Sequence, residues 1–216
     1  MTWERARTEQ QKQQRIQEII DATARLYQER SFEEITFALI AKEAKFTRSN
    51  LYKYFNSKEE IFFEFLKYDI VTWRKDFVSS VCDKAFSVEE FAEMWFEVQQ
   101  RHLRMQDLIS ILYAHLEKKS SLETLVSFKK MVVSEFGILC GVLQSIFPKL
   151  SVANAIKFLQ IQLALSIGLY TMTDLSPTQE KVFEITEFAH LKMGYPQYFK
   201  QSLVYMLRGL INDSKV

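Results

Sequence analysis

The chain has 216 residues and a formal net charge of +1, with 48% hydrophobic, 14% aromatic and 25% charged residues. This composition is ordinary for a soluble globular protein with a sizeable core, and so small a net charge argues neither for nor against nucleic acid. No run of about 18 apolar residues occurs, so we expect no membrane span.

The N-terminal residues and the cysteines indicate the compartment. The first fifteen residues are polar and lack the apolar core of a signal peptide. Cys82 and Cys140 lie far apart in the sequence, and we interpret them as buried free thiols rather than as a disulfide framework. A cytoplasmic protein is therefore expected.

Apolar residues recur at helical spacing through most of the chain, whereas the alternating pattern of strands is absent. The sequence therefore predicts an all-α protein. Ser57 and Glu60 have the spacing of a capping box and should open the fourth helix. In chain order, the expected helices span residues 10–30, 36–45, 48–55, 57 to about 81, 87–105, 107–119, 122–147, 151–172, 178–192 and 196–212.

Residues 36–61 have the pattern of two short helices that meet at a tight corner, followed by the start of a third. Ile40, Ala41 and Ala44 are small or aliphatic, which lets the two short helices cross closely. Between residues 42 and 58 this stretch is also basic, since five bases oppose the single acid Glu43 and leave a surplus of four positive charges. These bases are Lys42, Lys45, Arg48, Lys53 and Lys58.

The second short helix should present polar side chains on its outward side. Thr47 can cap it through its hydroxyl, while Leu51 and Phe55 point inward with Phe46. Arginine can bind guanine, and asparagine adenine, through two hydrogen bonds each when such a helix lies in the major groove of DNA. The side chains left on the exposed surface are Arg48, Ser49, Asn50, Tyr52, Lys53 and Tyr54.

At these positions the chain resembles the tetracycline-repressor (TetR) family of transcriptional regulators. The resemblance implies a helix-turn-helix DNA-binding domain over residues 1–66 and a larger helical effector-binding and dimerisation domain over residues 67–216. It further implies a repressor that a small apolar or aromatic ligand releases from a double-stranded DNA operator. The matching residues are Thr36, Ile40, Ala41, Ala44, Thr47, Leu51, Tyr52, Tyr54, Phe55, Lys58 and Ile61.

The same resemblance implies roles for individual residues. Thr36 and Thr47 should assist at the starts of the two short helices. Base or near-base contacts are expected from Arg48, Ser49, Asn50 and Tyr52, and contacts along the phosphate backbone are expected from Lys53, Tyr54 and Lys58.

Two positions depart from the family pattern. Lys45 stands in the turn where the family usually has glycine, and a left-handed non-glycine residue costs about 1–2 kcal/mol. Either the turn is strained or its backbone differs. Ala38 and Leu39 replace residues that are often polar, which weakens the case for phosphate contacts from the first short helix.

Residues 151–172 and 196–212 are apolar around most of the helix circumference. Such helices must be covered on both faces, by the protein's own core on one side and by another surface on the other. The sequence therefore predicts a homodimer through these two helices. The alternative is that both helices are central in a monomer.

Aromatic residues fall on successive helices of the second domain and would suit a drug-sized apolar effector. The alternative is that the rings only fill the core. An effector near Trp73 or Phe77 could tilt the helix that follows Ser57, and so change the spacing of about 34 Å between two recognition helices. The candidate effector-binding residues are Trp73, Phe77, Trp95, His102, Tyr113, Phe136 and Tyr170.

An enzyme is not expected. The Glu-x-x-His motif of di-iron bundles occurs once, at Glu187 and His190, without the second copy that such a site needs. No zinc pattern, phosphate-binding glycine loop or serine nucleophile motif is present, so no catalytic residue, metal or cofactor is predicted. The remaining alternatives are a helical binding or adaptor protein without DNA function and, less favoured, a helical metalloenzyme.

Overall fold

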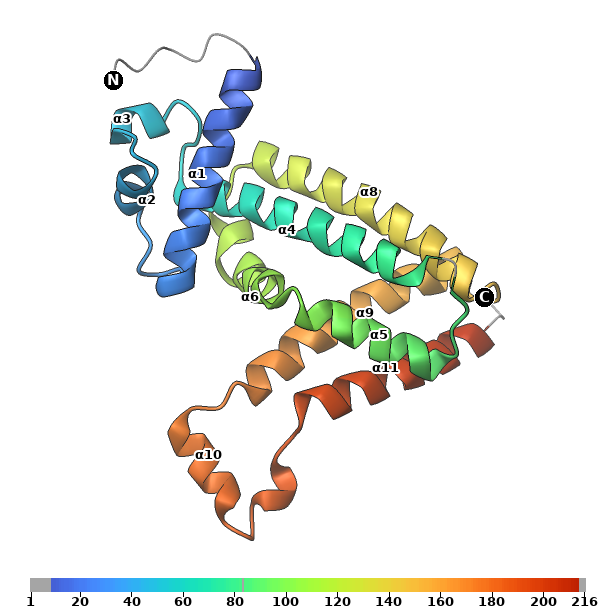
Figure 1. Ribbon diagram of the computed structural model, residues 1–216. Coiled ribbons are helices and arrows are strands. Elements are labelled where there is room, and N and C mark those ends of the chain that lie inside the picture. Colours follow the sequence, from blue (N-terminus) through green and yellow to red (C-terminus); the bar gives the residue numbers. More distant parts are fainter. Residues whose placement is uncertain (1–8, 83, 214–216) are drawn as a thin grey trace. The chain divides into compact units, whose positions relative to one another are not determined.

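The computed structural model describes residues 9–82 and 84–213, and this part of the chain is helical without a strand, which confirms the all-α prediction (Figure 1). The helices are α1 (Glu9–Glu29), α2 (Phe37–Glu43), α3 (Arg48–Leu51), α4 (Lys58–Val81), α5 (Val88–Gln100), α6 (Leu103–Ile111), the π-helix η1 (Leu112–Leu116), α7 (Glu117–Lys119), α8 (Leu122–Ile146), α9 (Val152–Thr173), α10 (Pro177–Glu184), the 3-10 helix η2 (Ala189–Leu191) and α11 (Tyr195–Asn212).

Three helix ends differ from the sequence prediction. α3 ends after Leu51, and turns follow where the helix was expected to continue. The helix expected over residues 87–105 breaks near His102, whose N–H donates to the carbonyl of Gln99 at 2.9 Å in a tighter turn. The helix expected over residues 178–192 stops before Ile185, because that residue adopts extended backbone with φ −72° and ψ 123°.

The start of α4 is capped differently from the predicted capping box. Ser57 Oγ accepts from the N–H of Glu60 at 3.3 Å, as expected. The carboxylate of Glu60, however, accepts from the N–H of Asn56 at 2.8 Å and also from the Asn56 amide. Only one half of the reciprocal pair is therefore formed, since Glu60 reaches one residue further back.

The chain divides into two compact units. The first unit comprises residues up to 70 together with residues 107–131, and its core is aromatic. The ring of Phe62 packs edge-on against Phe32 at 4.9 Å and against Tyr27 at 5.5 Å between centroids. Phe63 packs against Phe128 at 5.0 Å. These contacts hold α1 and the loop after it on the first turns of α4, and so support α2 and α3.

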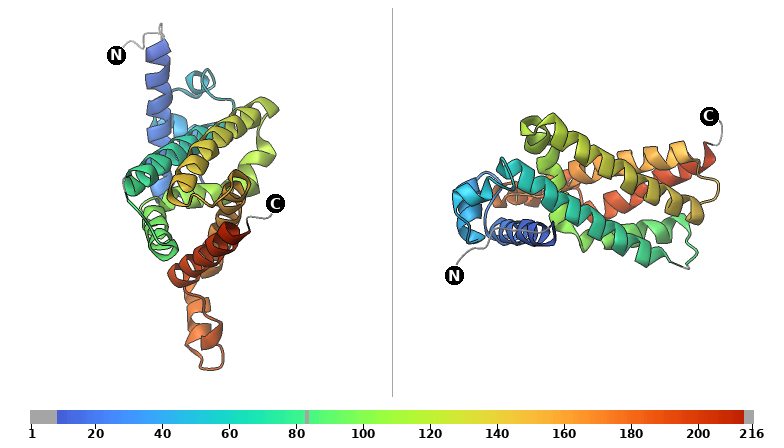
Figure 2. Two further views of the ribbon diagram at one scale, coloured as in Figure 1. Left: turned by 90° about the vertical axis from the view of Figure 1, so that its right-hand side faces the viewer. Right: turned by 90° about the horizontal axis from the view of Figure 1, so that it is seen from above.

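The second unit comprises residues 71–106 together with residues from 132 onward. Here α11 packs side by side with α9 and also against α5 (Figure 2). Asn154 of α9 donates its amide to the carbonyl of Leu210 at 2.9 Å, and Lys200 of α11 pairs with Glu93 of α5 at 2.7 Å. Buried Trp95 lies in the core between these helices.

Among the described helices, α9 alone has the length and apolar composition that would suffice to cross a membrane. Its buried face nevertheless carries Asn154, Gln162 and Ser166, and each of these side chains hydrogen-bonds to a neighbour in the second unit. This is the pattern of a core helix, and it gives only weak evidence of insertion into a membrane.

The two cysteines differ in their surroundings. Neither forms a disulfide. Cys140 on α8 is buried as expected, and its burial raises the pKa of its thiol. Cys82 is exposed, so the prediction of a buried thiol is wrong for this residue, because it follows the last turn of α4 at the start of a connection.

The segment between α9 and α11 projects beyond the paired ends of these helices (Figure 1). It contains α10 and η2, and these two elements contact each other. No residue from 171 to 194 is buried, although the segment includes large apolar side chains such as Val182, Ile185 and Leu191. Its packing therefore contributes little to the core of the second unit.

Candidate nucleic-acid interface and effector region

The corner between α2 and α3 is closed by a helix-ending motif centred on Lys45. Its φ of 59° is the only positive φ among the described non-glycine residues, so the turn keeps the left-handed backbone in spite of the lysine. Phe46 N–H donates to Ala41 O at 2.8 Å, and Lys45 N–H donates to Lys42 O at 3.1 Å. These two bonds form a Schellman motif, which satisfies the last carbonyls of α2.

Both short helices begin with a threonine cap. Thr36 Oγ1 accepts from the N–H of Leu39 at 3.2 Å, and Thr47 Oγ1 accepts from the N–H of Asn50 at 3.1 Å. This confirms the cap predicted for Thr47. Because each cap satisfies an otherwise unpaired amide, even the four-residue α3 has a defined start.

The inward side of α3 anchors it to the unit. Leu51 and Phe55 are buried, as predicted from the sequence. Phe46, which was expected in the core, is only half-buried and lies edge-on to Tyr54 with 6.0 Å between centroids. The guanidinium of Arg15 lies over the ring of Phe46, 5.9 Å from its centroid. Tyr54 is thus partly engaged in local packing.

Tyr52 is held in an outward position by two neighbours. Its ring lies 4.6 Å from that of Phe37, the first residue of α2, and the guanidinium of Arg48 lies 5.9 Å from its centroid. The side chain is still 48% exposed. Phe37 was not singled out in the sequence, because its ring supports Tyr52 from a different helix, fifteen positions away.

Asn50 and Lys53 interact with each other on the outer side of α3. Asn50 Oδ1 accepts from Lys53 Nζ at 2.8 Å, and Asn50 is half-buried whereas Lys53 and Ser49 are exposed. Recognition of adenine by asparagine uses both the amide oxygen and the amide nitrogen. Asn50 would therefore exchange its bond with Lys53 for one with a base.

Lys58 is directed differently from the expectation. Its Nζ donates to the carbonyls of Phe32 at 2.7 Å and Ile35 at 2.8 Å, and it lies 4.0 Å from the centroid of the Phe32 ring. Burial lowers the pKa of its ammonium group, partly opposed by the charges of Glu59 and Glu33. Here Lys58 ties the loop before α2 to the start of α4.

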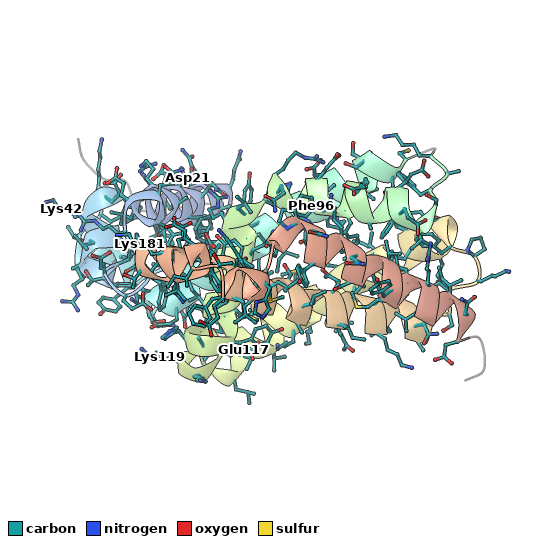
Figure 3. The ribbon with its side chains drawn as sticks, turned by 90° about the horizontal axis from the view of Figure 1, so that it is seen from below. Asp21, Lys42, Phe96, Glu117, Lys119 and Lys181 are labelled. Carbon is teal, nitrogen blue, oxygen red and sulfur yellow. The ribbon has the colours of Figure 1, made fainter. Side chains whose placement is uncertain are left out.

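The basic surplus of the segment lies on its surface. Lys42, Lys45, Arg48 and Lys53 are exposed, and Figure 3 labels Lys42 on α2. The single acid between residues 42 and 58, Glu43, pairs with Arg25 of α1 at 2.8 Å. Because this pair neutralises Glu43, the exposed bases form a positive surface suited to a polyanion.

The predicted effector residues fall into separate groups. Trp73, Phe77 and Trp95 come together as a buried cluster in the second unit. The centroids of Trp73 and Phe77 are 5.7 Å apart, and those of Phe77 and Trp95 are 4.9 Å apart. Tyr113 lies in the first unit and is 47% exposed, with Lys129 Nζ 5.7 Å from its ring.

The other candidates lie within the second unit. Phe136 is half-buried on α8, and Tyr170 is half-buried at 6.1 Å from Tyr195 between centroids. The same core also buries a set of uncharged polar residues that were not predicted from the sequence: Gln99, Gln106, Gln162, Ser166 and Tyr195. The sequence did not indicate that these residues are buried, because each one is a single polar residue on a helix face that is otherwise apolar.

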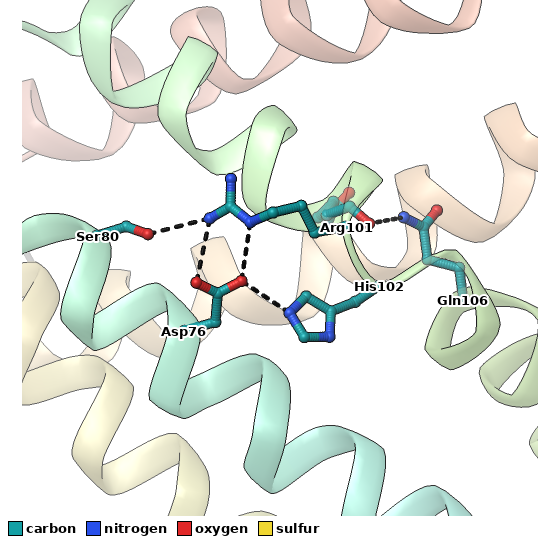
Figure 4. Close-up of polar contacts among 6 residues, drawn as sticks. Asp76, Ser80, Arg101, His102 and Gln106 are labelled. Atoms are coloured by element: carbon teal, nitrogen blue, oxygen red, sulfur yellow. Dashed lines mark hydrogen bonds and ion pairs between the residues drawn. The ribbon is translucent and has the colours of Figure 1, made fainter.

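His102 belongs to a polar cluster centred on Asp76 (Figure 4). The carboxylate of Asp76 accepts from Arg101 Nε at 3.0 Å and lies 2.8 Å from His102 Nε2, while Arg101 also donates to Ser80 Oγ at 3.1 Å. The hydrogen bond from Arg101 holds the pKa of Asp76 below its ordinary value, with a smaller contribution from His102. The cluster fastens α4 to the turn between α5 and α6.

Solved structures with a similar fold include three regulators called FadR. The regulator of fatty acid degradation from Bacillus halodurans has a TM-score of 0.59 at 16% identity, over 90% of this chain and 96% of that one. The Thermus thermophilus protein, in complex with lauroyl-CoA, has a TM-score of 0.57 at 15% identity, over 93% and 95%. The Bacillus subtilis protein, in complex with stearoyl-CoA, has 0.52 at 18% identity, over 88% and 96%. At these identities the similarity shows the fold alone.

Sequence comparison identifies the family. No curated protein matches the chain significantly. The family profile described as "Bacterial regulatory proteins, tetR family" matches residues 19–65 and so contains the α2–α3 corner with its capped, exposed helix. The profile described as "Tetracyclin repressor-like, C-terminal domain" matches residues 68–214. The two matches account for most of the chain, which therefore belongs to the TetR family of bacterial transcriptional regulators.

Proposed function

We propose that this protein is a sequence-specific DNA-binding repressor that a small apolar or aromatic molecule releases from its operator. The observation that carries the proposal is the short, threonine-capped α3 with the turn after it, which together expose Arg48, Tyr52 and Lys53 on a positive surface. Such a helix can enter the major groove with its N-terminal residues at base edges. The profile match over residues 19–65 supports this placement.

Within residues 36–54 we propose different roles for the side chains that would meet bases and those that would meet phosphates. Arg48, Ser49, Asn50 and Tyr52 read or approach bases, whereas Lys53 and Tyr54 contact phosphates with help from Thr36 and Thr47. The exposure of Arg48, Ser49, Tyr52 and Lys53 supports these roles. Lys58 remains a predicted phosphate contact, but it must first leave the two carbonyls that it now binds.

We propose residues 1–66 as the DNA-binding domain and residues 67–216 as the effector-binding and dimerisation domain. The profile matches at 19–65 and 68–214 support a division near this point. We further propose that the protein is a regulator without enzymatic activity. This proposal rests on its membership of the TetR family. As a regulator of transcription, it would act in the cytoplasm.

The proposed homodimer forms through helices 151–172 and 196–212. On α9 the side chains of Ile156, Ile161 and Met172 are exposed, and on α11 Tyr198 and Tyr205 are exposed. Uncovered apolar and aromatic side chains on two neighbouring helices suit a self-complementary two-fold interface. Such a dimer would place two copies of α3 at successive major grooves, about 34 Å apart.

The proposed effector binds in the second unit, near Trp73, Phe77 and Trp95. Their aromatic surroundings suit an apolar ligand. Two of the structurally similar regulators were solved with acyl-CoA molecules, which supports the idea that this fold can hold an apolar effector. Release requires that the effector binds the DNA-bound and free conformations with different affinity.

The test is selection of bound sequences from random duplex DNA, followed by titration of the selected duplex against a scrambled one. We expect a two-fold symmetric sequence whose half-sites are one helical turn apart. Equal affinity for selected and scrambled duplexes at physiological salt would contradict the proposed function.

A further inference from the structure

The core of the second unit contains buried polar atoms without a hydrogen-bond partner. Within the described residues these atoms are the indole Nε1 of Trp73, the indole Nε1 of Trp95 and Oε1 of Gln99. The three residues are only 5%, 0% and 4% exposed. Burying a donor or acceptor without a partner is costly, and native proteins keep few such atoms. Their occurrence in one core therefore requires an explanation.

The three side chains are neighbours. The rings of Trp73 and Trp95 have centroids 5.3 Å apart and cross at 73°. Trp95 and Gln99 are four residues apart on α5, so their side chains lie on the same face of that helix. Two unpaired N–H donors and one unpaired carbonyl acceptor thus belong to a single layer where α4 meets α5. Phe77 and Phe158 pack against Trp95 at 4.9 and 5.4 Å and make the rest of this layer apolar.

The polar groups next to this layer are neutral and already joined to one another. Gln99 Nε2 donates to Gln162 Oε1 at 3.2 Å, which leaves its own Oε1 as the unpaired atom. Gln106 Nε2 donates to the backbone carbonyl of Gln99 at 3.2 Å. Tyr195 donates to Gln106 Oε1 at 3.0 Å. The network fixes the orientation of Gln99 and offers no charge to a ligand.

The buried or clustered carboxylates Glu135 and Asp76 of the second unit already have partners. Glu135, the one buried charged residue in the described part of this unit, pairs with Arg74 at 2.7 Å. Asp76 is bound by Arg101 and His102. An ionic ligand group beside Gln99 would therefore lose its hydration without gaining a counter-ion, which is strongly unfavourable.

We propose that Trp73, Trp95 and Gln99 recognise the polar group of a neutral effector, and that this group is an amide. Its carbonyl oxygen would accept from the two indole N–H groups, and its N–H would donate to Gln99 Oε1. A carboxylate has acceptors only and would oppose the lone pairs of Gln99. The inference rests on the proposed function, because it specifies the effector of that same regulator.

The test uses the purified full-length protein without DNA and two matched pairs of probes. 2-Naphthamide is compared with 2-naphthoate, and decanamide with decanoate, by isothermal titration calorimetry at neutral pH. We expect the amide to bind at least about tenfold more tightly than its carboxylate in one or both pairs. Equal or tighter binding of both carboxylates, or no binding of either amide, would overturn the proposal.

Variants then identify the atoms involved. Trp73→Phe and Trp95→Phe keep an aromatic ring but remove the N–H, and each should lower the amide-to-carboxylate affinity ratio about three- to tenfold. Phe158→Leu is the matched control, because it removes ring volume from the same core without removing a donor, and the ratio should persist. Circular dichroism checks folding, and the wild-type comparison stands even where a variant does not fold. An unchanged ratio in both folded tryptophan variants would show that the indoles do not contact the probe.

Failure of the amide proposal can be distinguished from failure of the proposed function. Binding to the selected duplex is measured in the absence of any probe. Intact operator binding with no preference for amides overturns only the identity of the effector group, whereas loss of all sequence preference overturns the regulator itself.

Discussion

Lys45 adopts a backbone conformation that favours glycine, and the orientation of α3 depends on it. A residue with a Cβ atom at φ 59° destabilises the folded state by about 1–2 kcal/mol relative to glycine. Glycine in turn favours the unfolded chain by up to about 1 kcal/mol, which offsets part of this difference. We predict that Lys45→Gly increases the free energy of unfolding by about 0.5–1 kcal/mol, measured by urea denaturation. Lys45→Ala keeps the Cβ atom and should give no gain. A similar gain from alanine would show that the left-handed backbone is not the cause.

Asn50 is the residue whose proposed role is most easily separated from simple charge attraction. We predict that Asn50→Ala lowers affinity for the selected operator by about 1–3 kcal/mol and relaxes the choice of sequence at one position per half-site. Lys53→Ala should instead weaken all duplexes and reduce the slope of log affinity against log salt by about one unit per phosphate contact. Fluorescence anisotropy titrations on specific and scrambled DNA compare the two. Equal losses on both duplexes for Asn50→Ala would refute base reading.

Lys58 supports the DNA-binding unit through two backbone carbonyls. We predict that Lys58→Met, which keeps the aliphatic stem, lowers the free energy of unfolding by about 1–3 kcal/mol, because the carbonyls of the buried residues Phe32 and Ile35 lose a charged donor. Urea denaturation measures the loss. If stability is unchanged and only the salt dependence of DNA binding falls, the lysine acts mainly on phosphate.

At the residue scale, the sequence predicted those features that depend on close neighbours. The cap at Thr47 and the inward side of α3 follow from helical spacing, and the structure confirms both. The direction of Lys58 could not be predicted in this way. Its acceptors lie 26 and 23 residues earlier in the chain, at Phe32 and Ile35, and only the folded loop brings them within reach.

The Asp76 cluster shows how one carboxylate can fasten two helices. Because Arg101 holds the pKa of Asp76 below its ordinary value of 3.8, the ionised form stabilises the folded state. This stability is fully present above the ordinary pKa and is lost as the pH falls through the lowered one. We predict that Asp76→Asn is less stable than wild type at pH 7 and that the difference shrinks below about pH 4. Urea denaturation across pH 3–7 tests this, and a difference independent of pH would exclude the ion pair as its source.

At the scale of elements, every helix of the prediction exists, but several ends differ. Apolar periodicity locates a helix, whereas its end depends on which partners the terminal groups find. The break after Gln100 occurs where Arg101 and His102 both turn to Asp76 on α4, a partner 25 residues away for Arg101. Likewise, the carboxylate of Glu60 accepts from the N–H of Asn56 rather than from that of Ser57, which the spacing of Ser57 and Glu60 alone did not predict.

At the scale of the whole molecule, the proposed dimer decides whether two recognition helices act together. We predict that Tyr205→Glu, at a side chain 63% exposed on α11, converts the dimer to monomers. Sedimentation velocity at micromolar concentration should show the change, and operator affinity should fall with it, because each monomer reads one half-site. Tyr205→Phe is the control and should stay dimeric. A wild-type protein that is itself monomeric would contradict the proposal.

The candidate effector site could be predicted only in part from the sequence. Trp73, Phe77 and Trp95 were predicted as effector-binding residues, which stays a prediction, and their rings meet in the second unit. Tyr113 lies in the first unit. Helices of both units show the same apolar periodicity, so this periodicity does not predict which core a helix packs against. Gln99 went unnoticed, since a single amide on an apolar face resembles a surface residue until its burial is known.

The projecting segment between α9 and α11 has a practical implication for protein engineering. Since none of its residues from 174 to 194 is buried, its side chains are not what keeps the surrounding helices folded. The antiparallel pairing of α9 with α11 relies on other groups, including the bond from Asn154 to Leu210. A fluorescent label or an affinity tag can therefore be inserted in this projecting segment, or the segment can be replaced by a shorter connection, with little loss of stability in the rest of the fold.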